Sequence, residues 1–145
     1  MKRKKILSYS AEETIDLGRE FARTLKLKDV IGLQGRLGSG KTQFVKGIAR
    51  YFKVKDIVNS PSFLIINEYR GIDPVTKEDV NLNHFDFYRL DKKEELDVLG
   101  FEEFINDDSI CIIEWCDLAE EYLNTELKKV IFEYGKYKNE RIVKI

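Results

Sequence analysis

The residues with the clearest chemical potential form one short run, residues 35–42, with the sequence Gly-Arg-Leu-Gly-Ser-Gly-Lys-Thr. The run fits the phosphate-binding pattern GxxxxGK[ST] at every required position. Glycines let the backbone turn its N–H groups inward, because no Cβ blocks the approach of a phosphate oxygen. We expect Lys41 to bind the β- and γ-phosphates and the Thr42 hydroxyl to bind Mg²⁺. The residues expected to contact the nucleotide here are Leu37, Gly38, Ser39, Gly40, Lys41, Thr42 and Gln43.

Residues 84–88, with the sequence His-Phe-Asp-Phe-Tyr, offer a carboxylate that could support the metal. Alternation along a strand places His84 and Asp86 on one face and the two phenylalanines on the other. A phosphate-loop enzyme needs a carboxylate at the end of a neighbouring strand, so Asp86 is predicted to be a catalytic and metal-supporting residue. The alternative is a half-exposed strand whose polar side chains face solvent.

A second carboxylate, Glu114, follows the apolar run 110–113 and precedes Trp115, the only tryptophan. The carboxyl ends of parallel strands line the ligand crevice, so Glu114 is predicted to bind the metal or orient water. Trp115 is predicted to contact the base, with a packed structural role as the alternative.

Two hydroxyl groups and one guanidinium group are weaker candidates for the nucleotide site. Ser60 and Ser62 flank a proline after the loop helix, where nucleotide switches place a hydroxyl that senses the γ-phosphate. A plain turn is the alternative for both serines. Arg89 could stabilise transition-state charge, but a lone arginine is more often a surface ion-pair former.

The elements that must position these residues alternate between strand and helix patterns. Residues 29–34 read as a buried strand entering the loop, and residues 43–51 as a helix leaving it. A capping box at Ser10 starts an earlier helix. The pattern predicts an α/β sandwich with a mixed sheet. The expected strands are 6–9, 29–34, 63–66, 81–88, 110–113, 129–134 and 141–145, and the expected helices are 11–25, 43–51, 92–105 with a break near Gly100, and 118–123.

Length and composition limit the function classes. The chain has 145 residues and a net charge of −1, so we expect a single domain, 1–145, without a broad cationic surface for strong nucleic-acid binding. The basic residues 2–5 are expected to form a solvated terminus. No apolar stretch is long enough for a membrane span and no secretory signal pattern is visible, so the expected location is the cytoplasm. Cys111 and Cys116 are expected to be reduced thiols in a core.

Two short matches to GTPase signatures fall in the wrong places. Residues 76–79 resemble the guanine-specifying [NT]KxD pattern but lie in the expected hairpin turn. Residues 97–100 resemble DxxG but lie in a helical stretch. ATP is therefore preferred over GTP.

Taken together, residues 35–42, 60–63, 84–90, 99–100 and 113–115 resemble the TsaE (YjeE) family in order and spacing. The resemblance covers nearly the whole chain. It implies a P-loop NTPase-like three-layer sandwich with a mixed, mostly parallel central sheet and antiparallel hairpin strands. It also implies an accessory ATPase that acts with the TsaD and TsaB proteins in making threonylcarbamoyladenosine in tRNA, with low activity alone and with tRNA reached only through the complex.

By matching position, the resemblance assigns Lys41 and Thr42 to phosphate and Mg²⁺, Asp86 to the metal, and Glu114 and Trp115 to the nucleotide site. Two alternatives to a partner-dependent ATPase stay open. A small-metabolite kinase would need an arginine-bearing lid over the phosphates. A nucleotide-binding adaptor would bind ATP without useful hydrolysis.

Three positions depart from the family pattern. Ser62 stands where the family usually has threonine, and it keeps a hydroxyl. Gln43 replaces a common threonine or serine, which weakens the expectation of a hydroxyl contact to the α-phosphate. Residues 116–117, Cys-Asp, replace the usual ending after the tryptophan.

Overall fold

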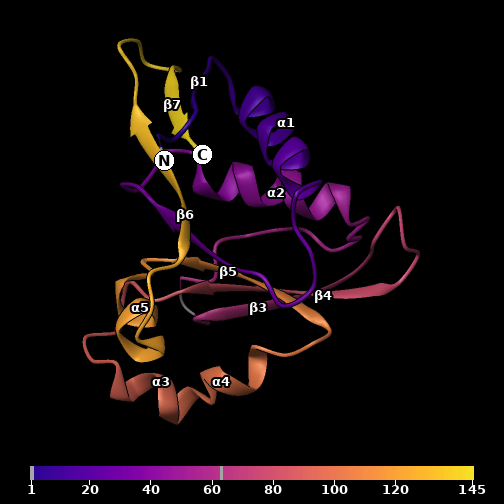
Figure 1. Cartoon of the computed structure of the whole chain (residues 1–145). Helices are drawn as coiled ribbons and strands as arrows, with labels where there is room; N and C mark the ends of the chain where they lie inside the picture. The colour runs from indigo at the N-terminus through magenta and orange to yellow at the C-terminus, as the bar shows by residue number, and fades with distance from the viewer. Residues whose placement is uncertain (1, 63) are drawn as a thin grey trace.

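The computed structural model describes residues 2–62 and 64–145, which form one seven-stranded sheet with helices on both faces (Figure 1). The strand order is β1-β7-β6-β2-β5-β4-β3. The strands are β1 (Lys5–Ser8), β2 (Val30–Gln34), β3 (Ile66–Ile72), β4 (Asp79–Asp86), β5 (Ser109–Glu114), β6 (Lys128–Tyr134) and β7 (Arg141–Lys144). The helices are α1 (Ala11–Ala22), α2 (Lys41–Tyr51), α3 (Glu94–Leu99), α4 (Phe101–Phe104) and α5 (Asp117–Leu123).

The centre of the sheet is parallel and its edges are antiparallel. Strand β2 pairs in parallel with β5 and β6, and β4 pairs in parallel with β5. Strand β3 runs antiparallel to β4, and β7 runs antiparallel to both β6 and β1. Strands β1, β6, β2, β5 and β4 therefore point one way, which confirms the expected mixed, mostly parallel sheet with antiparallel hairpin strands.

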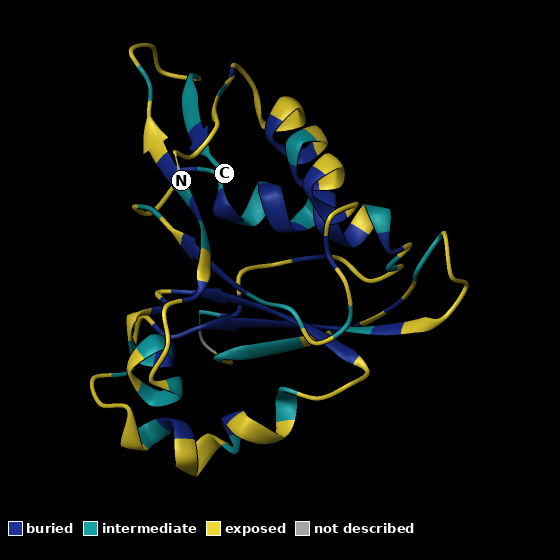
Figure 2. Cartoon of the chain, in the orientation of Figure 1, coloured by how far each residue is buried: buried dark blue, intermediate teal, exposed yellow. Residues whose placement is uncertain are grey.

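Helices α1 and α2 cover one face of the sheet, and α3, α4 and α5 cover the other (Figure 1). On β5, Ile110 and Ile112 belong to the core under α1 and α2, whereas Cys111 and Ile113 belong to the core under the other helices. Every residue of β5 is buried, as Figure 2 shows for the central strands. A continuous apolar run is what a strand covered on both faces requires.

Two glycines allow α1 and α2 to pack closely. A Cβ at Gly18 would lie 2.0 Å from the carbonyl oxygen of Phe44, and a Cβ at Gly47 would lie 1.9 Å from that of Ile15. The two helices can approach this closely only because both positions lack side chains. This contact fixes α2, and with it the residues at its N-terminus, against the rest of the fold.

The expected elements are present, with shifted ends. The strand expected at 63–66 is wrong: β3 begins at Ile66 and runs to Ile72, and residue 63 lies outside the described residues. The turn follows at 73–78, where Asp73 accepts the N–H groups of Val75 and Thr76. Such an Asx turn gives the chain its reversal after β3.

Two helix signals of the sequence are confirmed. Ser10 caps α1 by accepting the Glu13 N–H at 3.1 Å, although the helix ends at Ala22 rather than residue 25. The helical stretch after residue 92 is divided into α3 and α4 at Gly100, whose φ of +70° suits glycine. No helix among the described residues has the length and apolar character that crossing a bilayer needs.

Candidate functional site

The phosphate loop and the carboxyl ends of β4 and β5 enclose one cavity of about 230 Å³. The loop joins β2 to α2, and β2 lies beside β5, so the fold brings the three segments together. The cavity gathers almost all residues that the sequence predicted for the site. Its lining consists of Leu37, Gly38, Gly40, Lys41, Thr42, Gln43, Ser60, Ser62, Asp86, Glu114 and Trp115.

The loop adopts a conformation that depends on glycine. Gly38 has a φ of +76° and Gly40 a φ of +108°, both in the region that glycine favours. A Cβ on Gly35 would lie 2.6 Å from Ser39 Oγ and 2.8 Å from the Phe132 carbonyl oxygen. Gly40 is also the N-cap of α2, so the free N–H groups of the first helical turn face the loop. This arrangement suits a bound anion.

Lys41 lies at the bottom of the cavity with only 6% of its surface exposed. Its Nζ donates a 2.5 Å hydrogen bond to the Gly35 carbonyl oxygen and lies 3.9 Å from Glu114 Oε1. Burial lowers the pKa of Lys41 from its usual value of 10.5, and the carboxylates of Glu114 and Asp86 oppose that shift. A buried ammonium of this kind is suited to binding phosphate oxygens, which carry a strong negative counter-charge.

Glu114 is held between Lys41 and a fully buried histidine. His84 Nε2 lies 2.6 Å from Glu114 Oε2, on the face of the sheet that α2 covers. An ionised carboxylate only accepts hydrogen bonds, so Nε2 is the donor. His84 Nδ1 has no hydrogen-bond partner among the described residues. The alternative of a solvent-facing His84 is wrong, and its pairing with Glu114 is a site feature that the sequence prediction missed.

Asp86 binds the segment after α2 on one side and the chain after β4 on the other. Asp86 Oδ2 accepts hydrogen bonds from Ser60 Oγ and Ser62 Oγ, each at 3.3 Å, and the two hydroxyls lie 3.0 Å apart. Asp86 Oδ1 accepts the Tyr88 N–H at 2.9 Å. Asp86 is 5% exposed, so the half-exposed alternative is wrong for it as well.

Trp115 stands at the mouth of the cavity with 41% of its surface exposed. Its φ is +55°, an uncommon conformation for a bulky residue, and its ring lies over Lys41 Nζ at 4.9 Å. The Tyr88 ring lies 4.9 Å from it. Strained residues of this kind concentrate at functional sites, which favours a ligand contact over a packed cap for Trp115.

Of three further candidates, one lines the cavity and two are not among its described lining residues. Ser39 is buried, its N–H binds the Arg36 carbonyl oxygen, and its side chain is not part of the cavity lining. Leu37 lines the cavity but is 88% exposed. Arg89 is exposed and is not among the described residues that line the cavity.

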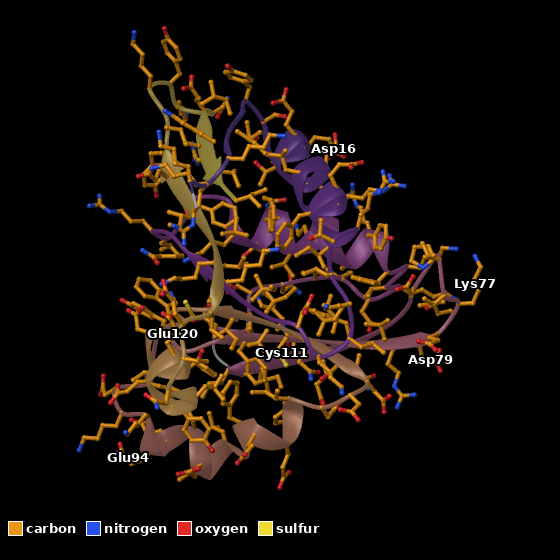
Figure 3. The ribbon with its side chains drawn as sticks, viewed as in Figure 1. Asp16, Lys77, Asp79, Glu94, Cys111 and Glu120 are labelled. Atoms are coloured by element: carbon orange, nitrogen blue, oxygen red, sulfur yellow. The ribbon has the colours of Figure 1, made fainter. Side chains whose placement is uncertain are left out.

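The two GTPase-like matches lie away from the cavity. Figure 3 shows Lys77 and Asp79 at the outer end of the β3–β4 hairpin, and residues 97–100 belong to α3 and the residue that ends it. Cys111 lies inside the core, and both cysteines are free and buried, as expected.

The donor set fits a magnesium–phosphate ligand. The Thr42 hydroxyl and the carboxylates of Asp86 and Glu114 are hard oxygen donors, which Mg²⁺ prefers. The loop N–H groups and the Lys41 ammonium supply the donors that a polyphosphate needs. The cavity can therefore hold phosphates and a divalent cation side by side.

Comparisons with known proteins give one consistent result. The family model described as "Threonylcarbamoyl adenosine biosynthesis protein TsaE" matches residues 8–143. A Bacillus subtilis protein named tRNA threonylcarbamoyladenosine biosynthesis protein TsaE is 37% identical over 134 residues, which cover 92% of this chain and 79% of the relative. A protein of the same name from Aquifex aeolicus is 36% identical over 137 residues, covering 88% of this chain and 93% of the relative.

The fold comparison agrees with the sequence comparison. A crystal structure of Bacillus subtilis YdiB superposes with a TM-score of 0.76 and 33% identity. The match covers 99% of this chain and 84% of that structure. The similarity thus extends over the sheet, both helix layers and the phosphate loop.

Proposed function

Because this chain belongs to the TsaE family, we propose that it binds and hydrolyses ATP with Mg²⁺ as an accessory protein of tRNA threonylcarbamoyladenosine biosynthesis. All 145 residues would form a single P-loop ATPase domain. The observation that supports the proposal best is the convergence of Lys41, Thr42, Asp86 and Glu114 on one cavity from the loop and two neighbouring strands. Phosphate, metal and water chemistry all need groups of these types at that place.

Each side chain would have a distinct part. Lys41 would bind the β- and γ-phosphates with its buried ammonium. This contact would replace the present hydrogen bond from Lys41 to the Gly35 carbonyl oxygen. Thr42 and Asp86 would hold Mg²⁺, which would screen the phosphate charge. Glu114 would lie next to the γ-phosphate, where its carboxylate could bind the metal or orient water.

The hydrogen bonds of Ser60 and Ser62 would change with the state of the bound nucleotide. Both hydroxyls now donate to Asp86 Oδ2. A metal bound to Asp86 would compete for that oxygen and would change the position of the segment after α2. This is the kind of order change that nucleotide switches use.

The partners would be TsaD and TsaB. The net charge of −1 does not favour direct binding to a nucleic-acid backbone, so tRNA would be held by the complex rather than by this chain. A role in tRNA modification would place the protein in the cytoplasm. The names of the relatives support this function over a small-metabolite kinase.

Steady-state ATP hydrolysis with and without TsaB and TsaD tests the proposal. We expect slow hydrolysis alone, stimulation by the two partners together, and inorganic phosphate as the product. The Lys41→Ala variant is the matched negative control. No stimulation together with no association would reject the proposed function, and transfer of phosphate to a metabolite would favour a kinase.

A nucleotide-binding adaptor makes a different prediction. An adaptor would bind ATP tightly and do its work without hydrolysis, so Glu114→Ala would leave its action in tRNA modification unchanged. The proposed ATPase would lose multiple-turnover modification in that variant while still binding ATP. Modification of tRNA by the reconstituted complex, followed over several rounds, distinguishes the two.

A further inference from the structure

The β6–β7 hairpin reaches the outer part of the phosphate loop with two side chains. Tyr134 is the last residue of β6 and pairs in register with Arg141, the first residue of β7. The Tyr134 hydroxyl donates to the Leu37 carbonyl oxygen. Arg141 Nε and Nη2 both donate to the Gly38 carbonyl oxygen, at 3.3 and 3.2 Å. Two consecutive loop carbonyls are therefore bound to residues about a hundred positions further along the chain.

The two side chains also support each other. The Arg141 guanidinium lies over the Tyr134 ring, with 4.9 Å between Cζ and the ring centroid. Arg141 Nη1 donates to the carbonyl oxygens of Lys138 and Glu140 at 2.8 and 2.9 Å. The guanidinium thus uses its N–H groups on backbone carbonyls, and it would have to give these up to bind a phosphate directly.

Because the peptides are trans, the hydrogen bonds to these two carbonyl groups also fix the directions of the N–H groups that follow them. In a trans peptide the C=O and the following N–H point in opposite directions, and no cis peptide is present among the described residues. When the Leu37 carbonyl points to Tyr134, the Gly38 N–H points to the opposite side of the peptide, away from Tyr134, and Gly38 is one of the residues that line the cavity. When the Gly38 carbonyl points to Arg141, the Ser39 N–H points back to the Arg36 carbonyl oxygen, which it binds at 3.1 Å.

The loop needs such an external restraint. Leu37 is 88% exposed, and Gly38, which is also exposed, lies in a glycine-specific conformation with a φ of +76°. Glycine has more conformational freedom to lose than any other residue. A loop that is already ordered before the ligand arrives spends less of the binding energy on ordering itself.

We propose that Tyr134 and Arg141 are positioning residues that hold the phosphate loop in its binding conformation through the carbonyl groups of Leu37 and Gly38. The proposal rests on the proposed ATPase function. It assigns no direct contact with ATP to either residue. It predicts that losing these hydrogen bonds weakens nucleotide binding more than it slows the chemical step, because Lys41, Asp86 and Glu114 stay in place.

The test compares Tyr134→Phe with Tyr137→Phe. Tyr137 is an exposed tyrosine on the same hairpin with no hydrogen bond to the loop among the described residues, so its variant makes the same chemical change without the proposed effect. We expect Tyr134→Phe to raise the dissociation constant for Mg²⁺–ATP about 3- to 10-fold, with kcat within about twofold of the wild type. Tyr137→Phe should match the wild type in both quantities.

Arg141 variants separate hydrogen bonding from simple charge. Arg141→Gln should weaken binding about tenfold or more, since two bonds to the loop are lost. Arg141→Lys keeps the charge but cannot reproduce the planar fork, so we expect it to bind ATP nearly as weakly as Arg141→Gln. Full recovery by lysine would mean that Arg141 only attracts the triphosphate, and would overturn its positioning role.

Hydrogen exchange of the nucleotide-free protein tests the loop itself. We expect faster exchange in the peptide covering residues 35–42 for Tyr134→Phe and Arg141→Gln, with unchanged exchange in β5. Loop exchange and ATP affinity equal to those of the wild type in Tyr134→Phe would overturn the proposal. A wild-type protein that binds no ATP would defeat the proposed function instead, and the exchange experiment would still decide whether the pair orders the loop.

Discussion

His84 Nε2 lies 2.6 Å from Glu114 Oε2, and the other oxygen of the same carboxylate lies 3.9 Å from Lys41 Nζ. The two residues come from neighbouring parallel strands, β4 and β5. His84 is fully buried, and Glu114 is 3% exposed. The imidazole therefore sets the direction of a carboxylate that the proposed reaction needs next to the phosphates.

This relationship predicts a defect in catalysis for His84→Ala. Without the imidazole, Glu114 can turn toward Lys41 and lose its orientation, so kcat should fall about 10- to 100-fold, as for other residues that orient a reacting group. The KM for ATP should change much less. His84→Gln keeps a donor near the Nε2 position and should recover part of the rate. Equal kcat in the wild type and His84→Ala, in protein shown to be folded by circular dichroism, would contradict this role.

Asp86→Asn should impair the use of Mg²⁺. The variant keeps the size of the side chain but loses the charge that attracts the cation, so the Mg²⁺ concentration for half-maximal turnover should rise about tenfold or more. Asp79→Asn, an exposed residue at the start of the same strand, is the control and should behave as the wild type. Superimposable Mg²⁺ titrations for wild type and Asp86→Asn would remove Asp86 from the metal site.

Gly47→Ala tests the packing that holds α2. The added Cβ would lie 1.9 Å from the Ile15 carbonyl oxygen, so α1 and α2 must separate. We expect the free energy of unfolding to fall by about 1–3 kcal/mol, even though alanine favours a helix more than glycine does. Urea denaturation measures the change. Lys46→Ala, at the preceding position of α2, is the control, and a stability of Gly47→Ala equal to that of the control would show that the helices are not in contact at this point.

The two cysteines predict a loss of stability at high pH. Burial raises the pKa of both Cys111 and Cys116 from 9.0 to about 11. Between these two pKa values, the folded state keeps thiol protons that the unfolded state releases. The contribution of the two thiols to the free energy of unfolding is therefore complete below pH 9 and is lost as pH rises toward 11. Unfolding by urea from pH 8 to 10.5 should show a steeper decline for wild type than for a variant with both thiols replaced by alanine. Parallel curves would argue against the shifted pKa values.

Much of the fold could be predicted because its signals are local. The glycine loop, the apolar run of β5 and the capping residue Ser10 each depend on a few adjacent residues. The strand β3 begins at Ile66, where its register with β4 begins opposite Phe85, and that register depends on the partner strand. Strand ends decided by tertiary pairing cannot be found from residue types alone.

In the candidate site, too, some features have a local sequence signal and others depend on tertiary contacts. Asp86 and Glu114 could be predicted because each lies at or near the carboxyl end of a recognisable strand. The contact of His84 with Glu114 depends on β4 lying beside β5. The amino-acid sequence of neither strand specifies that order in the sheet. Tyr134 and Arg141 carry no signal at all for a loop role, since they lie 97 and 103 residues from the loop residues they bind.

Titration calorimetry of the purified protein with ATP and Mg²⁺ tests the central claim, that the loop and Lys41 bind a nucleoside triphosphate. The account predicts saturable binding of one ATP per chain, and loss of most of that affinity in Lys41→Ala, because a buried charge-assisted contact to the phosphates is removed. No detectable heat for the wild type, alone or with TsaB and TsaD, or equal affinity in the Lys41→Ala variant, would contradict it.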